Sequence, residues 1–432
     1  MKKSKFNIIV NAKDDKKLIF NSYSGALALI DEKSYEQYLN NNFYDDKLKE
    51  DLIHGKYLIE DDLDEIQYFK ALHNLSRYGR HSISLTIAPT LNCNMNCYYC
   101  FEEKKDISMD EEIISNLLDY IKGLIDELNL KLLNVTWYGG EPLLEIDKIS
   151  MLNDKIYELC ASKEVEYRQA IVTNGVLLTK ENVHKLNKHK NLEYCQVTLD
   201  GNKYTHDKSR RLKDQGVGSF DTIIKNVDLV AEDIEIHLRV NIQKNNINDA
   251  YELLDYFEKN NLKNRVSIYF APIRPDTEAC SHVENLCLSQ VDFAAFNSEI
   301  LTIAWEKGYD FPLYSYPSQS IISCGAITPN AYVIDPKGDL FKCWNEIGLE
   351  QYMVGNIKTG AQLNSENAKW LSHEIPDECY ECESLPICSG GCPYYRIRNI
   401  DNQCDYRKYM KDAIFNIFYA KHKEKKEAEV SA

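Results

Sequence analysis

The sequence lacks the long apolar runs and the cationic surplus that would place it in a membrane or on nucleic acid. No run of about 18 apolar residues occurs among its 432 residues, so we expect no transmembrane helix. The first residues carry lysines but no apolar h-region, which disfavours secretion. The formal net charge is −16, which disfavours nucleic-acid binding. We therefore expect a cytoplasmic location, with no membrane and no nucleic-acid partner.

Cysteine, by contrast, is plentiful. In a chain without an export signal, 14 cysteines indicate metal or redox chemistry rather than disulfides. The first three, Cys93, Cys97 and Cys100, have Cx3Cx2C spacing and follow a predicted strand over residues 83–88. Three thiolates can hold three irons of a four-iron cluster and leave the fourth iron open to a substrate or cofactor.

A structural zinc knuckle and a set of buried apolar cysteines are the alternatives for this group. A zinc knuckle closes with a fourth ligand nearby, whereas the next cysteine in the chain is Cys160. The clustering of three cysteines on a short polar loop also argues against burial in a core. We therefore favour the cluster with an open iron.

A Gly-Gly-Glu-Pro turn follows about forty residues later, at the end of a second predicted strand over residues 132–138. Glycines let the backbone approach a ligand closely, and the carboxylate of Glu141 suits an ammonium group. With the aromatic Tyr99 inside the cysteine motif, this pair of motifs resembles the radical S-adenosylmethionine (SAM) family. The resemblance implies a 4Fe-4S cluster on the three cysteines, with Gly139, Gly140 and Glu141 holding the amino group of SAM.

Strands and helices alternate between residues 81 and 272. The predicted strands cover 83–88, 132–138, 167–173, 194–199, 234–242 and 265–271, and the predicted helices cover 109–128, 148–162, 180–188, 220–231 and 247–260. Ser108 and Glu111 have the spacing of a capping box for the first helix. Six β/α units predict a parallel sheet with right-handed crossovers, short of the eight that close a full barrel. The fold class is therefore α/β, and the resemblance implies the partial (β/α)6 barrel of radical SAM enzymes.

Polar residues stand at the carboxyl ends of the predicted strands, where parallel barrels gather their chemistry. They are Thr173, Asn174, Asp200 and Arg239. The SPASM subgroup of radical SAM proteins has similar residues at the SAM site, so the resemblance implies contacts with SAM or substrate. Each residue taken singly is equally well explained as a capping or turn residue. The tract over residues 206–211 also resembles the subgroup, and one role that it can have is to order a loop.

Seven cysteines between residues 324 and 404 follow the order of the SPASM pattern. The resemblance implies two auxiliary 4Fe-4S clusters, hence three clusters in all. The implied ligands are Cys324, Cys343 and Cys392 for one cluster, and Cys379, Cys382, Cys388 and Cys404 for the other. A zinc ribbon is the alternative, although seven cysteines exceed one four-ligand site. With three ligands, the first auxiliary cluster either has an open iron or borrows Cys280, Cys287 or a substrate thiol.

Residues 1–80 are predicted to form a separate module. Strands over 6–11, 17–21 and 26–30 precede helices over 32–40 and 46–54, and this order resembles the winged-helix module that binds peptides on many peptide-modifying enzymes. Such modules take a leader peptide as an added strand at a sheet edge, and a structural cap on the next domain is the alternative. A bridging region over 273–323, with a helix at 290–307, leads to a SPASM domain over 324–432, in which 332–334 and 340–343 predict a hairpin.

The resemblance implies an enzyme that cleaves SAM to a 5′-deoxyadenosyl radical, which abstracts a hydrogen atom from its substrate. Our leading hypothesis is a peptide maturase that forms a cysteine thioether in a ribosomally made precursor with a leader, as in ranthipeptide and sactipeptide synthesis. An external electron donor such as flavodoxin or ferredoxin is implied. The alternatives are an anaerobic sulfatase maturase, a carbon–carbon cross-linking maturase and, from another class, a non-catalytic iron–sulfur electron-transfer protein. The sequence assigns no catalytic residue.

Overall fold

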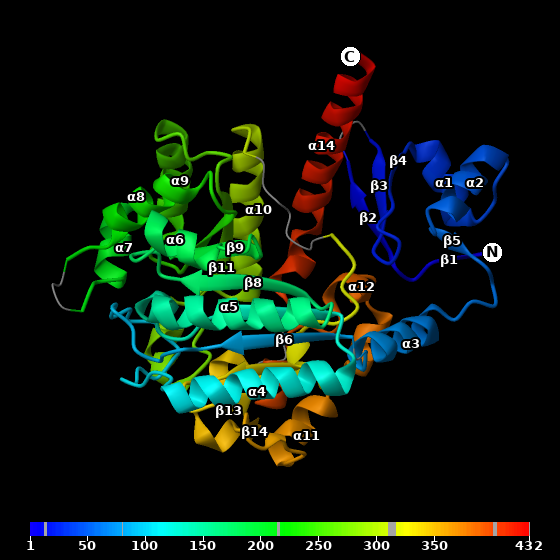
Figure 1. Ribbon diagram of the computed structural model, residues 1–432. Helices are drawn as coiled ribbons and strands as arrows, with labels where there is room; N and C mark the ends of the chain where they lie inside the picture. The colour runs from blue at the N-terminus through cyan, green and yellow to red at the C-terminus, as the bar shows by residue number, and fades with distance from the viewer. Residues whose placement is uncertain (13–14, 80, 214–216, 310–316, 401–403, 432) are drawn as a thin grey trace.

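A ten-stranded sheet organises the molecule, and a smaller N-terminal module stands beside it (Figure 1). The computed structural model describes residues 1–12, 15–79, 81–213, 217–309, 317–400 and 404–431. Within these residues, no helix is both long and apolar enough to cross a bilayer.

Six neighbouring parallel strands form one side of the large sheet, in the order β11-β10-β9-β8-β7-β6. They are β6 (Ser82–Ile87), β7 (Leu132–Trp137), β8 (Glu166–Thr173), β9 (Leu192–Leu199), β10 (Ile236–Ile242) and β11 (Ser267–Pro272). Each predicted strand agrees with these bounds to within a few residues, so the prediction of six parallel strands is confirmed. Because β11 ends the sheet on one side, the barrel is open.

Helices connect successive strands and pack on the sheet. They are α4 (Glu111–Leu128), α5 (Ile146–Ser162), α6 (Lys180–Leu186), α8 (Phe220–Val230) and α9 (Ile247–Lys259), and all five coincide with predicted helices. The short α7 (Lys203–Ser209), capped by the side chain of Asn202, has no counterpart among the predictions. Figure 1 shows α4 and α5 lying along the strands, so this face of the sheet is covered.

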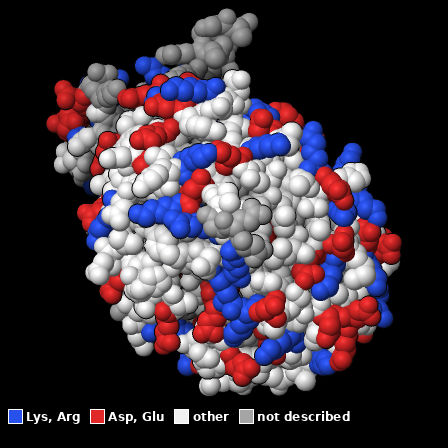
Figure 2. Space-filling view, turned by 90° about the vertical axis from the view of Figure 1, so that its left-hand side faces the viewer, with Lys and Arg blue, Asp and Glu red and all other residues white. Residues whose placement is uncertain are grey.

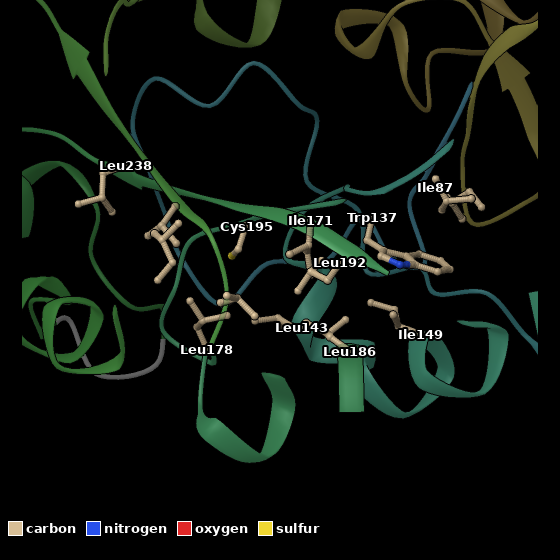
Figure 3. Close-up of a cluster of buried hydrophobic side chains, with 14 of the residues drawn as sticks. Ile87, Trp137, Leu143, Ile149, Ile171, Leu178, Leu186, Leu192, Cys195 and Leu238 are labelled. Atoms are coloured by element: carbon tan, nitrogen blue, oxygen red, sulfur yellow. The ribbon is translucent and has the colours of Figure 1, made fainter. Parts of the chain in front are cut away.

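The core between the sheet and these helices explains why the elements form where they do. Along β7 the side chains alternate between buried and half-buried, and Val135 and Trp137 lie on the buried side. Figure 3 shows Trp137 and Ile171, from neighbouring strands, facing Leu143. The indole Nε1 of Trp137 donates to Oε1 of Gln169 over 2.8 Å, so its polar atom is satisfied inside the core. Burial of each such large side chain stabilises the fold by about 1.5–3 kcal/mol.

The start of α4 corrects one prediction. The N-cap is Asp110, whose carboxylate accepts from the backbone N–H of Ile113 over 2.8 Å. The hydroxyl of Ser108 instead donates to Oγ1 of Thr90 over 2.8 Å, in the loop that follows β6. The capping box of Ser108 and Glu111 was therefore wrong, because aspartate caps a helix as well as serine does and Ser108 has a tertiary partner.

The large sheet continues into the C-terminal part of the chain. The strand β12 (Ala331–Ile334) pairs in parallel with β6, and β13 (Asp339–Phe341), β14 (Gly355–Asn356) and β15 (Gly360–Ala361) follow it antiparallel. The predicted hairpin is thus confirmed as β12 and β13, but the sequence did not predict that it extends the barrel sheet. The helices of this part are α11 (Ser365–Leu371), α12 (Leu385–Cys388), α13 (Pro393–Ile397) and α14 (Lys411–Ser431).

Between the barrel and β12 lie a 3-10 segment, η2 (Glu278–Leu286), and the helix α10 (Gln290–Glu306). The helix matches the one predicted over 290–307. It packs against α14, and both helices contribute to a core that also includes strands of the N-terminal module. The bridging region therefore holds together three parts of the chain that are far apart in the sequence.

The N-terminal module has an antiparallel sheet of β2 (Asn7–Asn11), β3 (Lys17–Asn21) and β4 (Leu27–Ile30), followed by α1 (Glu32–Asn40) and α2 (Asp46–His54). These elements confirm the predicted order of strands and helices. A short pair, β1 (Lys2–Lys3) with β5 (Leu58–Ile59), and the helix α3 (Glu65–Arg77) complete it. The predicted boundary at residue 80 falls on a residue outside the described ranges.

Two contacts anchor this module to the rest of the protein. The ring of Phe20 on β3 lies 4.6 Å from that of Phe415 on α14. At the end of α3, the buried guanidinium of Arg77 donates to backbone carbonyls of Ile327, Trp370, Leu371 and His373. The module is therefore packed on the C-terminal part of the chain, which the sequence did not predict.

Candidate active site

A cavity of about 510 Å³ opens at the carboxyl ends of the parallel strands. That volume is in the range of small-molecule sites. Most of the predicted site residues around the barrel line it, namely Cys93, Cys97, Tyr99, Cys100, Gly139, Gly140, Thr173, Asn174 and Arg239. In Figure 2, which views the side toward which β6 and β8 point in Figure 1, Lys and Arg are mixed with Asp and Glu. The acidic excess of the chain is therefore not gathered into one patch on this face.

The cysteine loop is held by the segment that follows α7. The backbone N–H of Asn96 donates to the carbonyl of Arg211 over 2.9 Å, and that of Lys213 donates to the carbonyl of Asn94 over 2.9 Å. Between these bonds, Met95 and Leu212 form an isolated antiparallel bridge. The tract over residues 206–211 thus orders the cysteine loop, which is one of the roles considered from the sequence.

The two glycines of the Gly-Gly-Glu-Pro turn pack on the backbone just before the cysteines. A Cβ on Gly139, which has φ +106°, would lie 2.3 Å from the carbonyl oxygen of Thr90. A Cβ on Gly140 would lie 2.2 Å from the carbonyl oxygen of Asn92. The N–H of Glu141 donates to this same oxygen over 2.9 Å. The glycines are therefore required for the close approach of two backbone segments, besides any approach to a ligand.

The carboxylate of Glu141 is buried and has three protein donors. It accepts from the N–H of Leu143 over 3.0 Å, from Oγ1 of Thr173 over 2.6 Å and from the N–H of Asn174 over 2.8 Å. Burial still raises the pKa of Glu141, because desolvation outweighs these hydrogen bonds. Glu141 thus joins the turn to the end of β8, and its contact with the amino group of SAM stays a prediction.

Tyr99 and Asp200 meet in a buried polar network. The hydroxyl of Tyr99 donates to Oδ1 of Asp200 over 2.6 Å, and the guanidinium of Arg210 donates to that hydroxyl over 2.7 Å. Ser209 donates to the other carboxylate oxygen over 2.7 Å. Asp200 therefore does not line the cavity itself; it accepts a hydrogen bond from Tyr99, which does. Arg210 was missed as a site residue, although its tract had been noted in the sequence.

The first three cysteines fit a metal cluster in their chemistry. Burial raises the pKa of Cys93 to about 12 and that of Cys100 to about 11, so metal binding has to displace their protons. The N–H of Met95 points at Sγ of Cys93 over 3.4 Å, and Nδ2 of Asn174 lies 3.9 Å from the same sulfur. Such donors stabilise a thiolate ligand and tune the cluster that it holds. Within the described residues, no group of three or more His, Cys, Asp or Glu side chains is arranged to hold a single metal ion.

The C-terminal cysteines form the two sets expected from the sequence. Burial raises the pKa of Cys343 well above its usual value, and the nearby Cys324 and Cys392 raise it further. The pKa of Cys388 is likewise raised to about 11, by burial first and then by neighbours that include Cys379 and Cys382. Cys404 belongs to this second set, because it is one of the groups that raise the pKa of Cys379. The Sγ of Cys404 lies 3.5 Å from Nζ of Lys408. The structure brings these residues together, while their role as cluster ligands stays a prediction.

Cys280 and Cys287 lie elsewhere, beside the first cysteine loop. Both pack in a small apolar cluster with Tyr98, Tyr99 and Phe101. Cys280 is fully buried, and its thiol bonds within its own segment to the carbonyl of Thr277. Their apolar contacts are therefore with the first cysteine loop.

Several residues that line the cavity had no signal in the sequence. Asp276 accepts from the hydroxyl of Tyr395 over 2.8 Å and from Nδ2 of Asn345 over 3.4 Å. Burial raises the pKa of Asp276. The ring of Trp344 packs against that of Tyr138 at a tilt of 38°, with ring centroids 4.4 Å apart. These residues come from the end of β7, the bridging region and the C-terminal part, and only the fold brings them to one cavity.

Comparison with known proteins agrees with this geometry. Residues 87–257 match the model of the Radical SAM superfamily. This part of the chain therefore contains a radical SAM domain, as the resemblance carried by the cysteine and Gly-Gly-Glu-Pro motifs implied, and members of this superfamily are enzymes.

Two relatives have similar sequences. The chain is 32% identical over 183 residues to Fe-coproporphyrin III synthase of Methanosarcina barkeri, a match that spans 42% of this chain and 42% of that protein. It is 22% identical over 432 residues to the radical SAM cyclopropyl synthase TigE of Paramaledivibacter caminithermalis, spanning 90% of this chain and 89% of TigE.

Two solved structures share the fold. Native anSMEcpe with bound AdoMet and Cp18Cys peptide superposes with a TM-score of 0.59 at 19% identity, over 79% of this chain and 97% of that one. SuiB of Streptococcus suis bound to the precursor peptide SuiA superposes with a TM-score of 0.55 at 16% identity, over 94% of this chain and 98% of SuiB.

Proposed function

We propose that the protein is a radical SAM peptide maturase that forms a cysteine thioether in a ribosomally made precursor. One observation carries this proposal. The cavity at the cysteine loop is also lined by Trp344, Asn345 and Tyr395 of the C-terminal part, beside the auxiliary cysteines. A peptide side chain held there would lie between the radical source and the second metal site. The folds of SuiB and anSMEcpe, both solved with peptides, support a peptide substrate.

The chain's own residues suit this reaction. SAM and the reduced cluster, when bound, supply a radical that takes a hydrogen atom from the substrate. Arg210 lines the cavity, and its buried Nε has no hydrogen-bond partner among the described residues, so it is a donor for the carboxylate of SAM. Asp276 offers a carboxylate that accepts the proton of the substrate thiol. The auxiliary cysteine sets would hold metal centres able to take up the one electron that is released as the bond forms. An external donor such as flavodoxin or ferredoxin would supply the electron that cleaves SAM.

The position of Cys280 and Cys287 bears on the first auxiliary cluster. Both pack beside the loop of Cys100, in a different apolar cluster from Cys343. This favours the alternative in which Cys324, Cys343 and Cys392 leave one iron open. An open iron can hold the thiolate of a substrate cysteine, which a thioether maturase requires.

The N-terminal module is proposed to bind the leader peptide. Its sheet has the order β2-β3-β4, so β2 and β4 are both edge strands. Because β2 contacts α14, β4 is the edge to which a peptide strand can add. Hydrogen exchange measured with and without a precursor peptide tests this, with protection expected in β4 and not in β2. Equal protection of both strands, or of neither, supports a structural cap instead. The packing of Phe20 and Arg77 makes this a better test than deletion of residues 1–80, which would expose a core.

Mass spectrometry tests the main proposal. The full-length protein, reconstituted without oxygen, is incubated with SAM, a reductant and a short cysteine peptide encoded beside its gene. Thioether formation removes two hydrogen atoms and leaves the thiol unable to react with an alkylating agent. The Cys97→Ala variant should give neither the product nor 5′-deoxyadenosine. Deoxyadenosine without any change in the peptide would count against this substrate class and favour a sulfatase-derived peptide.

A carbon–carbon cross-link is the second candidate. The observation that favours it is the match to the cyclopropyl synthase TigE along 90% of this chain. In the same experiment, loss of two hydrogen atoms with every thiol still free to react would establish this candidate and exclude the thioether.

A further inference from the structure

Glu102 stands out among the charged residues of the cavity, because one of its carboxylate oxygens is unpartnered. It follows the cysteine loop directly and lines the cavity. Its Oε2 is buried and has no hydrogen-bond partner among the described residues. An ionised carboxylate buried in this way is costly unless a donor compensates it.

The other charged side chains that line the cavity have protein partners. Lys104 bonds to Asn96, Arg210 to Tyr99, Arg239 to Asn241, Arg274 to Gln290 and Asp276 to Tyr395. Of these groups, Arg210 also has an unpartnered buried atom, its Nε, which we have proposed as a donor to the carboxylate of SAM. Among the described residues that line the cavity, Glu102 is thus the carboxylate with an oxygen that the protein leaves available for a ligand.

The backbone that precedes Glu102 is fixed. The carbonyl of Phe101 accepts from Oγ1 of Thr277 over 2.8 Å, and the carbonyl of Tyr98 bonds to the ring of His282 over 2.8 Å. The cysteine loop is thereby attached to the bridging region. This attachment holds Glu102 in the cavity wall.

We propose that Glu102 binds a positively charged side chain, lysine or arginine, of the peptide substrate near the reacting cysteine. This inference rests on the proposed peptide function. SAM also carries a cationic amino group, but the Gly-Gly-Glu-Pro turn is the predicted partner of that group. A basic side chain gives the orphan oxygen of Glu102 a charge-assisted hydrogen bond, and it sets a sequence preference at one position of the substrate.

A peptide library tests the proposal. The full-length protein, reconstituted with iron and saturated with SAM but without reductant, is mixed with capped nonapeptides that share a central cysteine and vary at one other position. We expect bound peptides to be enriched in Lys and Arg over norleucine at one position by about tenfold, the size of one charge-assisted hydrogen bond. Glu102→Gln should remove this enrichment and leave the iron content unchanged.

Glu103 supplies the matched control. It is the next residue, is exposed and pairs with Lys105 over 3.3 Å. Glu103→Gln should keep the enrichment. If Glu102→Gln does not fold, the comparison of Lys with norleucine in the unmodified protein still decides the basic preference.

The outcomes separate this inference from the proposed function. Peptides bound without any basic preference overturn the role of Glu102 and leave the peptide maturase intact. No peptide bound at all overturns both. A Glu102→Gln variant that loses affinity for SAM while keeping the Lys and Arg preference overturns the inference, because Glu102 then serves the cation of SAM.

Discussion

The guanidinium of Arg210 lies 2.7 Å from the hydroxyl of Tyr99, and this contact links the segment after α7 to the cysteine loop. Both residues line the cavity. The hydroxyl of Tyr99 also donates a hydrogen bond to Asp200, at the end of β9. Backbone bonds from Arg211 and Lys213 to the same loop reinforce it. The geometry of the three cysteines therefore depends on residues more than a hundred positions away.

Replacing Arg210 should weaken both the fold and the metal site. Arg210 is 6% exposed and donates to the hydroxyl of Tyr99, which in turn donates to Asp200, so Arg210→Gln removes a buried cation that stabilises the Asp200 carboxylate. Loss of a buried hydrogen bond to a charged group costs about 1.5–3 kcal/mol. We expect a fall of this size in the free energy of unfolding, measured with urea, together with a lower iron content per chain.

The adjacent Arg211 is the control for that experiment. Its side chain is exposed, and only its backbone carbonyl bonds to the cysteine loop. Arg211→Gln should change the free energy of unfolding by less than about 0.5 kcal/mol. Equal effects of the two substitutions would contradict the special role of Arg210.

Gly140→Ala should disrupt the approach of the two motifs. The added Cβ would lie 2.2 Å from the carbonyl oxygen of Asn92 and 2.7 Å from that of Leu91, and backbone atoms cannot rotate away. Overpacking of this kind costs about 1–3 kcal/mol. Gly123→Ala, inside α4 with no atom within 4 Å of the new Cβ, should instead stabilise the protein by about 1 kcal/mol. Urea unfolding of both variants checks the opposite signs.

The sequence predicted most of the barrel because its strands and helices have clear apolar patterns and its motifs are local. The cysteine sets were recognisable for the same reason, since spacing along the chain defines them. Asp276 and Trp344 reach the cavity only through packing of the bridging and C-terminal parts, so no local pattern identifies them. Likewise, nothing in the sequence around Arg77 indicates that its guanidinium is buried against carbonyls of residues 327 to 373.

The stability of the protein should depend on pH through His206. This residue is buried, its Nδ1 accepts from the N–H of Asp200 over 3.3 Å, and its Nε2 lies 3.0 Å from Oγ of Ser219. Burial, with Arg210 nearby, holds the pKa of His206 well below its usual range. Below pH of about 6.5 the unfolded chain binds a proton that the folded chain does not, so the free energy of unfolding falls by about 1.4 kcal/mol per pH unit.

Urea unfolding between pH 7 and pH 5 measures this contribution. Here the pH range is about that in which free histidine titrates. His206→Gln should have a shallower dependence on pH than the unmodified protein, whatever its stability at pH 7. His184→Gln, on the exposed side of α6, should keep the original slope. Parallel slopes for all three proteins would show that His206 is protonated in the folded state.

Iron content tests the proposed division of the cysteines. Cys343→Ala should remove about four irons per chain, because the auxiliary cluster to which Cys343 is assigned is of the 4Fe-4S type. Cys160→Ala, in the core of α5, makes the same change in side chain and should leave the iron content unaltered while costing about 1 kcal/mol of stability. Cys280→Ala and Cys287→Ala, made separately, decide whether the first auxiliary cluster borrows a ligand from the bridging region. If both variants retain all their iron, neither cysteine is a ligand and the open iron is favoured. If either variant loses as much iron as Cys343→Ala, that cysteine is the fourth ligand, and the model in which an open iron holds the substrate thiolate has to be abandoned.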